Sequence, residues 1–262
     1  MIEIRAGERT SAFQAALNAN AGHQNYVSPM WSDFSRLLDP AKNPLCHDGR
    51  GRMEVFTALC DGRPLGRIVA SIHDASNSRH GTRRGQFGYF DCVDDWTIAS
   101  ALLQAAERWL SERGMHESVG NFNLTAMQMV GVMTGGFDHP PYTDMMWTPP
   151  HIATLLKRAG YVATFPMTTF ETDLETLDPS ALSDPAQAAT ERDPSLTWHN
   201  MARRTFKARL EDARIVLNAG FDKNPMFVPV SVEEYGFQAG EMMWIMDPRL
   251  SLVVHHKGEP VG

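Results

Sequence analysis

The chain has 262 residues, which is long for one hydrophobic core and comfortable for two domains. Its 43% hydrophobic and 21% charged residues are typical of a soluble globular protein. The net charge of −7 argues against a general binder of nucleic acid or anionic membranes, because either partner needs a basic face. No apolar run reaches membrane-spanning length, and the N-terminus lacks the apolar core of a signal peptide. A cytoplasmic protein without a membrane span is therefore expected.

Several common chemistries are not indicated. The three cysteines (Cys46, Cys60, Cys92) are odd in number and widely spaced, which predicts neither a disulfide framework nor a CxxC metal site. The ten histidines show no H-x-x-x-H spacing, so no metal is expected. No G-x-S-x-G elbow, Walker loop or G-x-G-x-x-G motif follows a predicted strand.

The first eighty-five residues predict a strand, two helices and a hairpin. Thr10 or Ser11 is the expected cap of the first helix, and Asp61-Gly62 is the expected hairpin turn. The polar segment 74–85, with the basic run 79–84 as a solvated tip, predicts a long hairpin loop. The elements themselves are a strand at 2–5, helices around 10–17 and 31–38, and strands at 53–60 and 65–73.

Residues 85–114 form the most regular stretch of the chain. An apolar and aromatic strand at 86–93 leads through Asp94-Asp95 into a long amphipathic helix that ends at Gly114. Either aspartate can cap that helix, because a carboxylate accepts the free N–H groups of the first turn. A strand at 117–122 follows and is expected to lie parallel to the central strand.

The segment 123–150 is rich in methionine and proline and predicts a long loop. It is either a flexible apolar pocket wall or an ordinary surface-packed loop, and the sequence leaves both open. Pro150 then opens a helix that ends at Gly160, and residues 161–174 predict a strand.

The composition changes after residue 177. Residues 178–195 are rich in proline, alanine and acidic side chains and predict a linker. A second unit is expected from Leu196 onward. Its elements are a helix at 200–216, a short helix at 232–238, a strand at 250–256, a turn at Lys257-Gly258 and the start of a hairpin partner at 260–262.

This order of elements over residues 1–175 resembles the GNAT superfamily of acyl-CoA-dependent acyltransferases. More closely, the chain resembles bacterial GNAT-like proteins of mostly unassigned function. The blocks that carry the resemblance are YVSPMWSDF…LDPAKNP (26–44), DGRPLGRIVASI (61–72), the stretch 85–115, GNFNLT (120–125) and GGFDHPPYTDMMWTPPHIATLLKRAGY (135–161).

The resemblance implies an α+β fold with a mixed, mostly antiparallel GNAT-type sheet flanked by helices. It implies a GNAT-like domain at 1–177, the linker at 178–195 and the start of a second, incomplete GNAT-like domain at 196–262. Because family members continue further, we expect this chain to stop within that second unit. An uncovered final hairpin edge would then favour a homodimer.

The resemblance also locates the expected CoA site at the turn between the central strand and the long helix. Family members carry Arg/Gln-x-x-Gly-x-Gly/Ala there, whereas this chain has Cys92-Val93-Asp94-Asp95-Trp96-Thr97. Two carboxylates near a pyrophosphate repel it by about 1 kcal/mol per charge pair even in water. We therefore predict a degenerate CoA site, with acetyl-CoA or acyl-CoA as a co-substrate at most and no tightly bound cofactor.

The candidate site residues follow from the same resemblance. Tyr89 and Asp91 lie at the end of the central strand, where a GNAT acid or base is found, and His139 and Tyr142 lie in a loop that would cover the cleft. Simple turn capping or hydrogen bonding to the backbone would also account for several of these residues. The candidate cofactor-binding residues are Val93, Asp94, Asp95, Trp96, Thr97, Asn123 and Thr125.

Two functions remain open. The first is an acyl-CoA-dependent N-acyltransferase, in which a small-molecule amine attacks a thioester. The second is a non-catalytic GNAT-like module that binds a small apolar ligand, an acyl chain or a protein partner.

Overall fold

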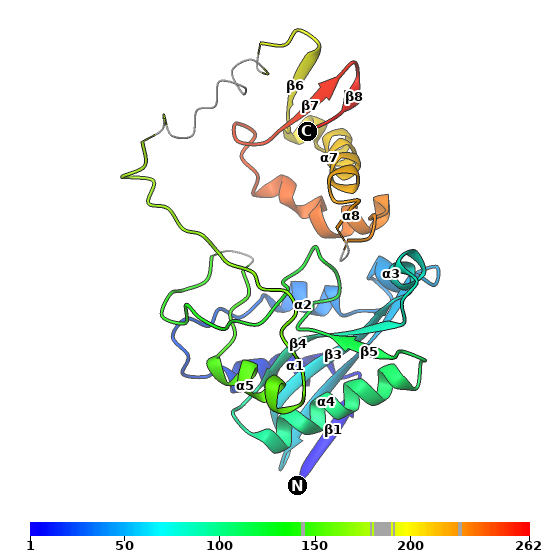
Figure 1. Cartoon of the computed structure of the whole chain (residues 1–262), viewed down its shortest axis with the longest axis vertical. Helices are drawn as coiled ribbons and strands as arrows, with labels where there is room; N and C mark the ends of the chain where they lie inside the picture. The colour runs from blue at the N-terminus through cyan, green and yellow to red at the C-terminus, as the bar shows by residue number, and fades with distance from the viewer. Residues whose placement is uncertain (143–144, 179, 181–189, 191, 225–226) are drawn as a thin grey trace. The chain divides into compact units, whose positions relative to one another are not determined.

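The computed structural model describes residues 1–142, 145–178, 180, 190, 192–224 and 227–262. These residues form two compact units, Met1–Thr164 and Phe165–Gly262 (Figure 1). The predicted linker at 178–195 lies mostly outside the described residues, and the predicted boundary at residue 177 stays a prediction.

Unit 1 contains a five-stranded sheet in the order β1-β2-β3-β4-β5. Its first four strands pair antiparallel, whereas β5 pairs parallel to β4. The strands are β1 (Ile2–Ala6), β2 (Gly51–Cys60), β3 (Arg63–His73), β4 (Arg84–Cys92) and β5 (Glu117–Val119). This is the mixed, mostly antiparallel sheet predicted by the sequence blocks.

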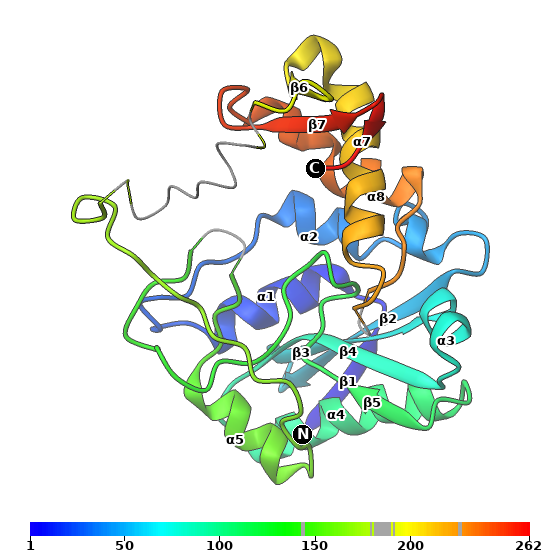
Figure 2. The same cartoon turned by 45° about the horizontal axis from the view of Figure 1, so that its top comes forward.

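Helices cover both faces of this sheet (Figure 2). On one face, α1 (Arg9–Ala19) and α2 (Trp31–Leu37) pack on β2–β4 through a cluster that includes Phe34, Val69 and Tyr89. On the other, α4 (Trp96–Ser111) and α5 (Pro150–Arg158) pack through a larger cluster that includes Phe90 and Leu102. The order of elements and the strand pairing make unit 1 GNAT-like in fold, as the sequence blocks predicted.

Unit 2 repeats the first steps of unit 1 with a shorter hairpin. Its sheet has the order β6-β7-β8, and all its pairs are antiparallel. The elements are β6 (Leu196–Asn200), η3 (Arg203–Thr205), α7 (Phe206–Gly220), α8 (Val232–Ala239), η4 (Gly240–Trp244), β7 (Leu252–His256) and β8 (Glu259–Pro260).

Both hairpins close through the same kind of turn. Asp61 and Gly62 join β2 to β3 with φ values of 49° and 80°, and Lys257 and Gly258 join β7 to β8 with values of 52° and 91°. Two consecutive left-handed residues define the tight hairpin turn whose twist matches that of the strands. Both predicted turns are therefore confirmed.

The structure corrects several predicted elements of unit 1. The segment 74–85 is not a loop, because α3 (Asp74–His80) forms there, with Asp74 in its first turn and the left-handed Gly81 after its last turn. Thr10 and Ser11 lie inside α1 and do not cap it, because the helix already starts at Arg9. The predicted strand at 117–122 ends at Val119, although the Phe122 N–H still donates to the Phe87 carbonyl of β4 at 2.7 Å.

One further prediction is wrong, and the bounds of another are shifted. Residues 161–174 form no strand: they have strand composition, but no described strand pairs with them. The helix predicted at 200–216 is present as α7, shifted to Phe206–Gly220, because Asn200 belongs to β6 and residues 203–205 form the short helix η3.

Candidate functional site

The candidate site lies where β4 and β5 separate. These strands pair only through Arg84–Gln86 and Glu117–Val119. Beyond that point β4 contains an extra residue relative to β3, because Arg67 pairs with Asp91 but Val69 pairs with Gly88. Tyr89 has a φ of 50°, a left-handed conformation that marks the bulge. Gly88 is required there, because a Cβ atom would lie 2.2 Å from the carbonyl oxygen of Phe122.

Two asparagine side chains replace the strand pairing that β4 loses. The Tyr89 N–H donates to Asn123 Oδ1 at 2.7 Å, and the Phe90 N–H donates to Asn121 Oδ1 at 3.3 Å. Both asparagines are buried. At the end of the strand, His151 Nε2 donates to the Cys92 carbonyl at 2.8 Å. The backbone of β4 beyond its pairing with β5 is therefore already bonded by side chains of this chain.

A buried ion pair lies across β3 and β4 on the α1 face. Arg67 is 3% exposed and Asp91 8% exposed, and Arg67 Nη2 lies 2.7 Å from Asp91 Oδ2. Asn20 Nδ2 donates to the other carboxylate oxygen at 3.1 Å. The Arg67 guanidinium also lies 4.7 Å from the centre of the Phe34 ring. The Asp91 carboxylate is thus held by an arginine and an amide.

Two polar atoms of this cluster have no hydrogen-bond partner among the described residues: Asn20 Oδ1 and Arg67 Nη1. One is an acceptor and the other a donor, and both are buried. Buried polar groups are usually hydrogen-bonded, so an unpaired pair of this kind indicates a place where a polar group could bind.

Aromatic side chains gather next to this cluster. The Trp147 ring lies 5.4 Å from that of His23 and 6.3 Å from that of Tyr26, and the His23 ring lies 6.2 Å from that of His151. Burial raises the pKa of Tyr26 to about 12, and the charge of Asp91 adds to this shift. Burial also raises the pKa of Tyr89 to about 12. Both phenols are therefore protonated near neutral pH.

The turn between β4 and α4 is acidic, as the sequence predicted. Asp94, Asp95 and Thr97 are exposed, whereas Val93 and Trp96 are half-buried. Asp95 Oδ1 accepts the Thr97 N–H at 2.7 Å and so caps α4, while Val93 N–H donates to the Leu65 carbonyl. Burial raises the pKa of Cys92, and the charges of Asp91, Asp94 and Asp95 add to the shift. Arg158 of α5 lies over the Trp96 ring at 4.4 Å.

The other predicted site residues lie on loops. His139 and Tyr142 are exposed, whereas Tyr89 and Asp91 are buried. Thr125 donates to Gln128 and accepts from the Met127 N–H, which is a local turn. The Met-rich loop is described only in part, since residues 143–144 lie outside the described residues.

Sequence reasoning missed Arg67, Asn20, Asn121 and His151. Arg67 had a readable signal, because a charged residue in the middle of the apolar run LGRIVASIH must find a buried partner. Asn20, Asn121 and His151 make their hydrogen bonds to segments distant in sequence, so no local sequence pattern predicts them.

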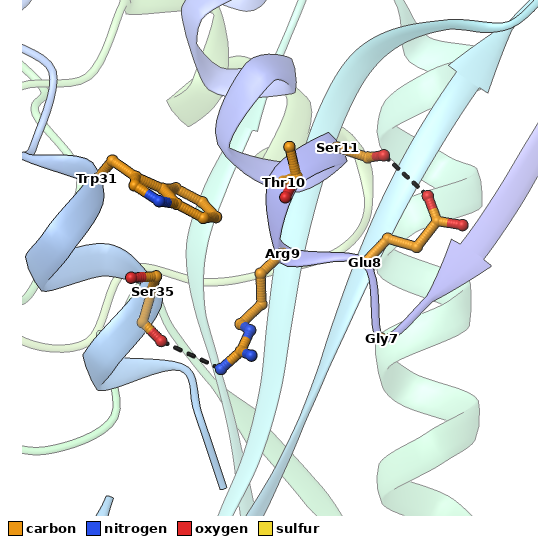
Figure 3. Close-up of a pocket in the computed structure, with 7 residues that line it drawn as sticks. All are labelled: Gly7, Glu8, Arg9, Thr10, Ser11, Trp31 and Ser35. Atoms are coloured by element: carbon orange, nitrogen blue, oxygen red, sulfur yellow. Dashed lines mark hydrogen bonds between the residues drawn. The ribbon is translucent and has the colours of Figure 1, made fainter. Parts of the chain in front are cut away.

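A hollow of about 410 Å³ lies at the opposite end of α1 (Figure 3). Its lining includes Arg9, which donates to the Ser35 carbonyl at 3.1 Å and pairs with Asp39 at 2.9 Å. Since Asp39 already balances the Arg9 charge, we assign no ligand to it. The full lining is Gly7, Glu8, Arg9, Thr10, Ser11, Trp31 and Ser35.

The described residues meet neither the requirements for a metal site nor those for a membrane-spanning helix. These ranges contain no group of three or more His, Cys, Asp or Glu side chains that could hold a metal ion. They also contain no helix with the length and apolar character needed to cross a membrane.

Comparison with known proteins supports an acyltransferase relationship. The chain is 29% identical over 260 residues to a bacterial ceramide synthase from Caulobacter vibrioides, covering 97% of this chain and 65% of that protein. It is 28% identical over 227 residues to Protein YghO from Escherichia coli K12, covering 85% of this chain and 56% of that protein. The chain thus spans less than two thirds of the length of either relative. No family model matches the sequence.

Solved structures similar to this chain include two acetyltransferases. An aminoglycoside acetyltransferase from an uncultured soil metagenomic sample aligns with 66% of this chain and 96% of its own, at 12% identity and a TM-score of 0.39. A ribosomal-protein-alanine N-acetyltransferase from Brucella melitensis biovar Abortus 2308 aligns with 65% of this chain and 99% of its own, at 16% identity and a TM-score of 0.39.

Proposed function

We propose that this chain is part of an N-acyltransferase that joins an acyl group to the amine of a lipid-like amino alcohol. The observation that carries the proposal is the similarity to a bacterial ceramide synthase over 97% of the chain. Ceramide is the amide of a long-chain amino alcohol, so its synthesis is N-acylation. The GNAT-like fold of unit 1 is consistent with this chemistry.

In the proposed reaction the amine nitrogen attacks the carbonyl carbon of an acyl-CoA thioester. A C–N bond forms and the C–S bond breaks, CoA leaves as its thiol, and the proton of the amine passes to a base. Tyr89, Asp91, His139 and Tyr142 stay the predicted catalytic residues. The unpaired donor and acceptor beside Asp91 would suit the polar end of the acceptor.

We propose that the turn after β4 does not hold CoA pyrophosphate in the family manner. Asp94 and Asp95 bring two negative charges to it, and Asp95 already satisfies the first turn of α4. Asn121, Asn123 and His151 bond the part of β4 that would face an acyl group. These contacts favour the second candidate function for unit 1, a non-catalytic ligand-binding module. The homodimer and the cytoplasmic location also stay predictions.

A ligand titration separates the two candidates. We would measure the thermal midpoint of the chain with acetyl-CoA and with a long-chain acyl-CoA, and assay amide formation with a long-chain amino alcohol. A ligand at 100 times its dissociation constant adds about 2.7 kcal/mol, or roughly 5–10 °C. Amide formation would establish the enzyme. A shift without amide formation would establish a binding module.

A charge-removing double variant tests whether the acidic turn weakens CoA binding. If Asp94 and Asp95 exclude CoA, then Asp94→Asn/Asp95→Asn should bind it more tightly. The matched variant Glu107→Gln/Glu112→Gln removes two charges from exposed sites farther along the same helix region and should not. Tight binding by the unaltered chain that is lost on replacing Trp96 or Thr97 would contradict the degenerate site.

A further inference from the structure

Unit 2 exposes four large apolar side chains within the nine-residue segment 242–250, here called the Trp244 patch: Met242, Trp244, Ile245 and Leu250. Trp244 is 65% exposed, Ile245 83% and Leu250 85%. They lie in η4 and in the segment between η4 and β7, drawn in orange to red in Figure 1. Single exposed apolar residues are ordinary, but several together, rimmed by polar side chains, mark an interaction surface.

A cation lies directly against the patch. Arg203 Cζ lies 5.4 Å from the centre of the Trp244 ring. The Met201 N–H donates to the Ser251 carbonyl at 3.0 Å and Asn200 Nδ2 donates to the Pro248 carbonyl at 2.9 Å, so the two segments are joined. Arg203, Arg204 and Lys207 are exposed. The exposed apolar side chains of the patch therefore lie near the exposed cations Arg203, Arg204 and Lys207.

The local charge is opposite to that of the whole chain. Residues 194–210 contain four cations and no carboxylate. Of these, Arg209 pairs with Asp212 at 2.7 Å, which leaves Arg203, Arg204 and Lys207. On the other segment Asp247 pairs with Arg249, and Glu241 is exposed. Although the net charge of −7 disfavours anionic partners in general, this region attracts them over a distance of about one Debye length, ~10 Å.

We propose that the Trp244 patch docks unit 2 on the surface of an anionic lipid bilayer. Trp244 would lie at the headgroup level, where an indole buries its apolar body and keeps its N–H in a polar layer. Ile245, Leu250 and Met242 would enter the boundary of the acyl chains, and Arg203 and Arg204 would face lipid phosphates. A protein with an acidic and apolar surface is the competing occupant, and the vesicle assay below distinguishes the two. This inference does not depend on the proposed enzymatic function.

The test measures partitioning of the chain onto vesicles by co-sedimentation. One set of vesicles contains equal amounts of phosphatidylglycerol and phosphatidylcholine, and the other contains phosphatidylcholine alone. We expect binding to the anionic vesicles that weakens with added salt. Trp244 should be quenched by brominated lipid, and Trp244→Phe should remove that part of the quenching.

Two variants dissect the patch. Arg203→Ala/Arg204→Ala should lower partitioning about 30-fold, because each cation contributes about 1 kcal/mol near an anionic surface. Trp244→Ser/Ile245→Ser should lower it at least about tenfold through lost apolar burial. The altered residues are exposed, and circular dichroism of each variant checks that the fold is intact.

Matched controls remove the same groups elsewhere. Phe165→Ser/Phe170→Ser deletes two exposed aromatic side chains from a segment that carries Glu171 and Asp173. Arg108→Ala/Lys157→Ala removes two exposed cations from α4 and α5. Both should partition as the unaltered chain does. Failure of the unaltered chain to bind anionic vesicles would overturn the proposal, as would equal losses in patch and control variants.

Discussion

Units 1 and 2 begin with the same series of elements. They differ in the length of the hairpin and in how many faces of the sheet are covered by helices. In each, a first strand pairs antiparallel with the first strand of a hairpin, two helices lie between them in sequence, and the hairpin closes on two left-handed residues. In unit 1 the hairpin strands have 10 and 11 residues, whereas in unit 2 they have 5 and 2.

Only unit 1 has both sheet faces covered within the described residues. There α1 and α2 cover one face, and α4 and α5 cover the other. In unit 2, α7 covers the face that carries His255, through contacts to Arg209 and Asp212. On the opposite face Trp198 and Leu252 remain exposed. The shared series therefore supplies one layer of helices in each unit, and the second layer of unit 1 comes from α4 and α5, which follow that series.

The largest expected difference concerns the ion pairs. Arg67→Ala leaves the buried Asp91 carboxylate without its cation and should lower the free energy of unfolding of unit 1 by about 3–5 kcal/mol. Arg209→Ala removes a partly exposed partner of Asp212 and should cost about 1 kcal/mol in unit 2. Hydrogen exchange of α4 and α7 reports on each unit. Similar losses of unfolding free energy in the two units would contradict the expected difference between the buried and the partly exposed ion pair.

A rescue variant separates charge from packing. Arg67→Met/Asp91→Leu replaces both charged side chains with apolar ones, and should recover most of the stability that Arg67→Ala loses. No recovery would mean that the stacking of Arg67 on Phe34, and not the ion pair, carries the effect.

The close approach of residues 122–123 to β4 depends on Gly88. Gly88→Ala places a Cβ atom against the Phe122 backbone and should cost about 1–3 kcal/mol or more, because backbone cannot give way cheaply. Gly135→Ala meets no atom within 4 Å and should change stability by less than about 0.5 kcal/mol. Chemical denaturation of the two variants measures the difference. A small effect at Gly88 would contradict the close approach of the two segments.

Alkaline pH should weaken unit 1 more than unit 2. All three cysteines lie in unit 1. Burial raises the pKa of one of them, Cys92. An unfolded thiol has a pKa of about 8.5, so the stability that burial adds is complete below that pH and is lost as pH rises toward the folded value. At about pH 10 the loss from Cys92 is about 2 kcal/mol.

Hydrogen exchange at neutral pH and at about pH 10 measures this loss in α4 against α7. Burial also raises the pKa of Cys46 to about 11, but its partial exposure reduces the contribution. Cys92→Ala should flatten the pH dependence of unit 1. An unchanged slope in that variant would exclude the buried thiol as the cause.

The smallest expected effects come from the helix caps, one in each unit. Asp95→Ala removes the acceptor of the Thr97 N–H, and Ser231→Ala removes the acceptor of the Glu234 N–H in a capping box. Each should cost about 1 kcal/mol. Thr10→Ala is the control, since Thr10 lies inside α1 and makes no capping bond. Thermal unfolding compares the three, and a larger loss at Thr10 would reinstate it as a cap.

Local patterns in the sequence determined most elements of this protein. The helical spacing after Asp95, the apolar run of the central strand and the two Xaa-Gly turns each predict structure from a few adjacent residues. The sequence blocks also predicted the GNAT-like order. In the candidate site, Tyr89, Asp91, Asn123 and the acidic turn were named from the sequence.

Tertiary structure decided the rest, because pairing and burial join segments far apart in the chain. Strand composition at 161–174 gave no strand without a partner, whereas β6 formed where β7 was available. The partners of Asp91 come from residues 24 and 71 positions away. Asn121, Asn123 and His151 bond β4 only because the sheet separates there, and no local pattern encodes that separation.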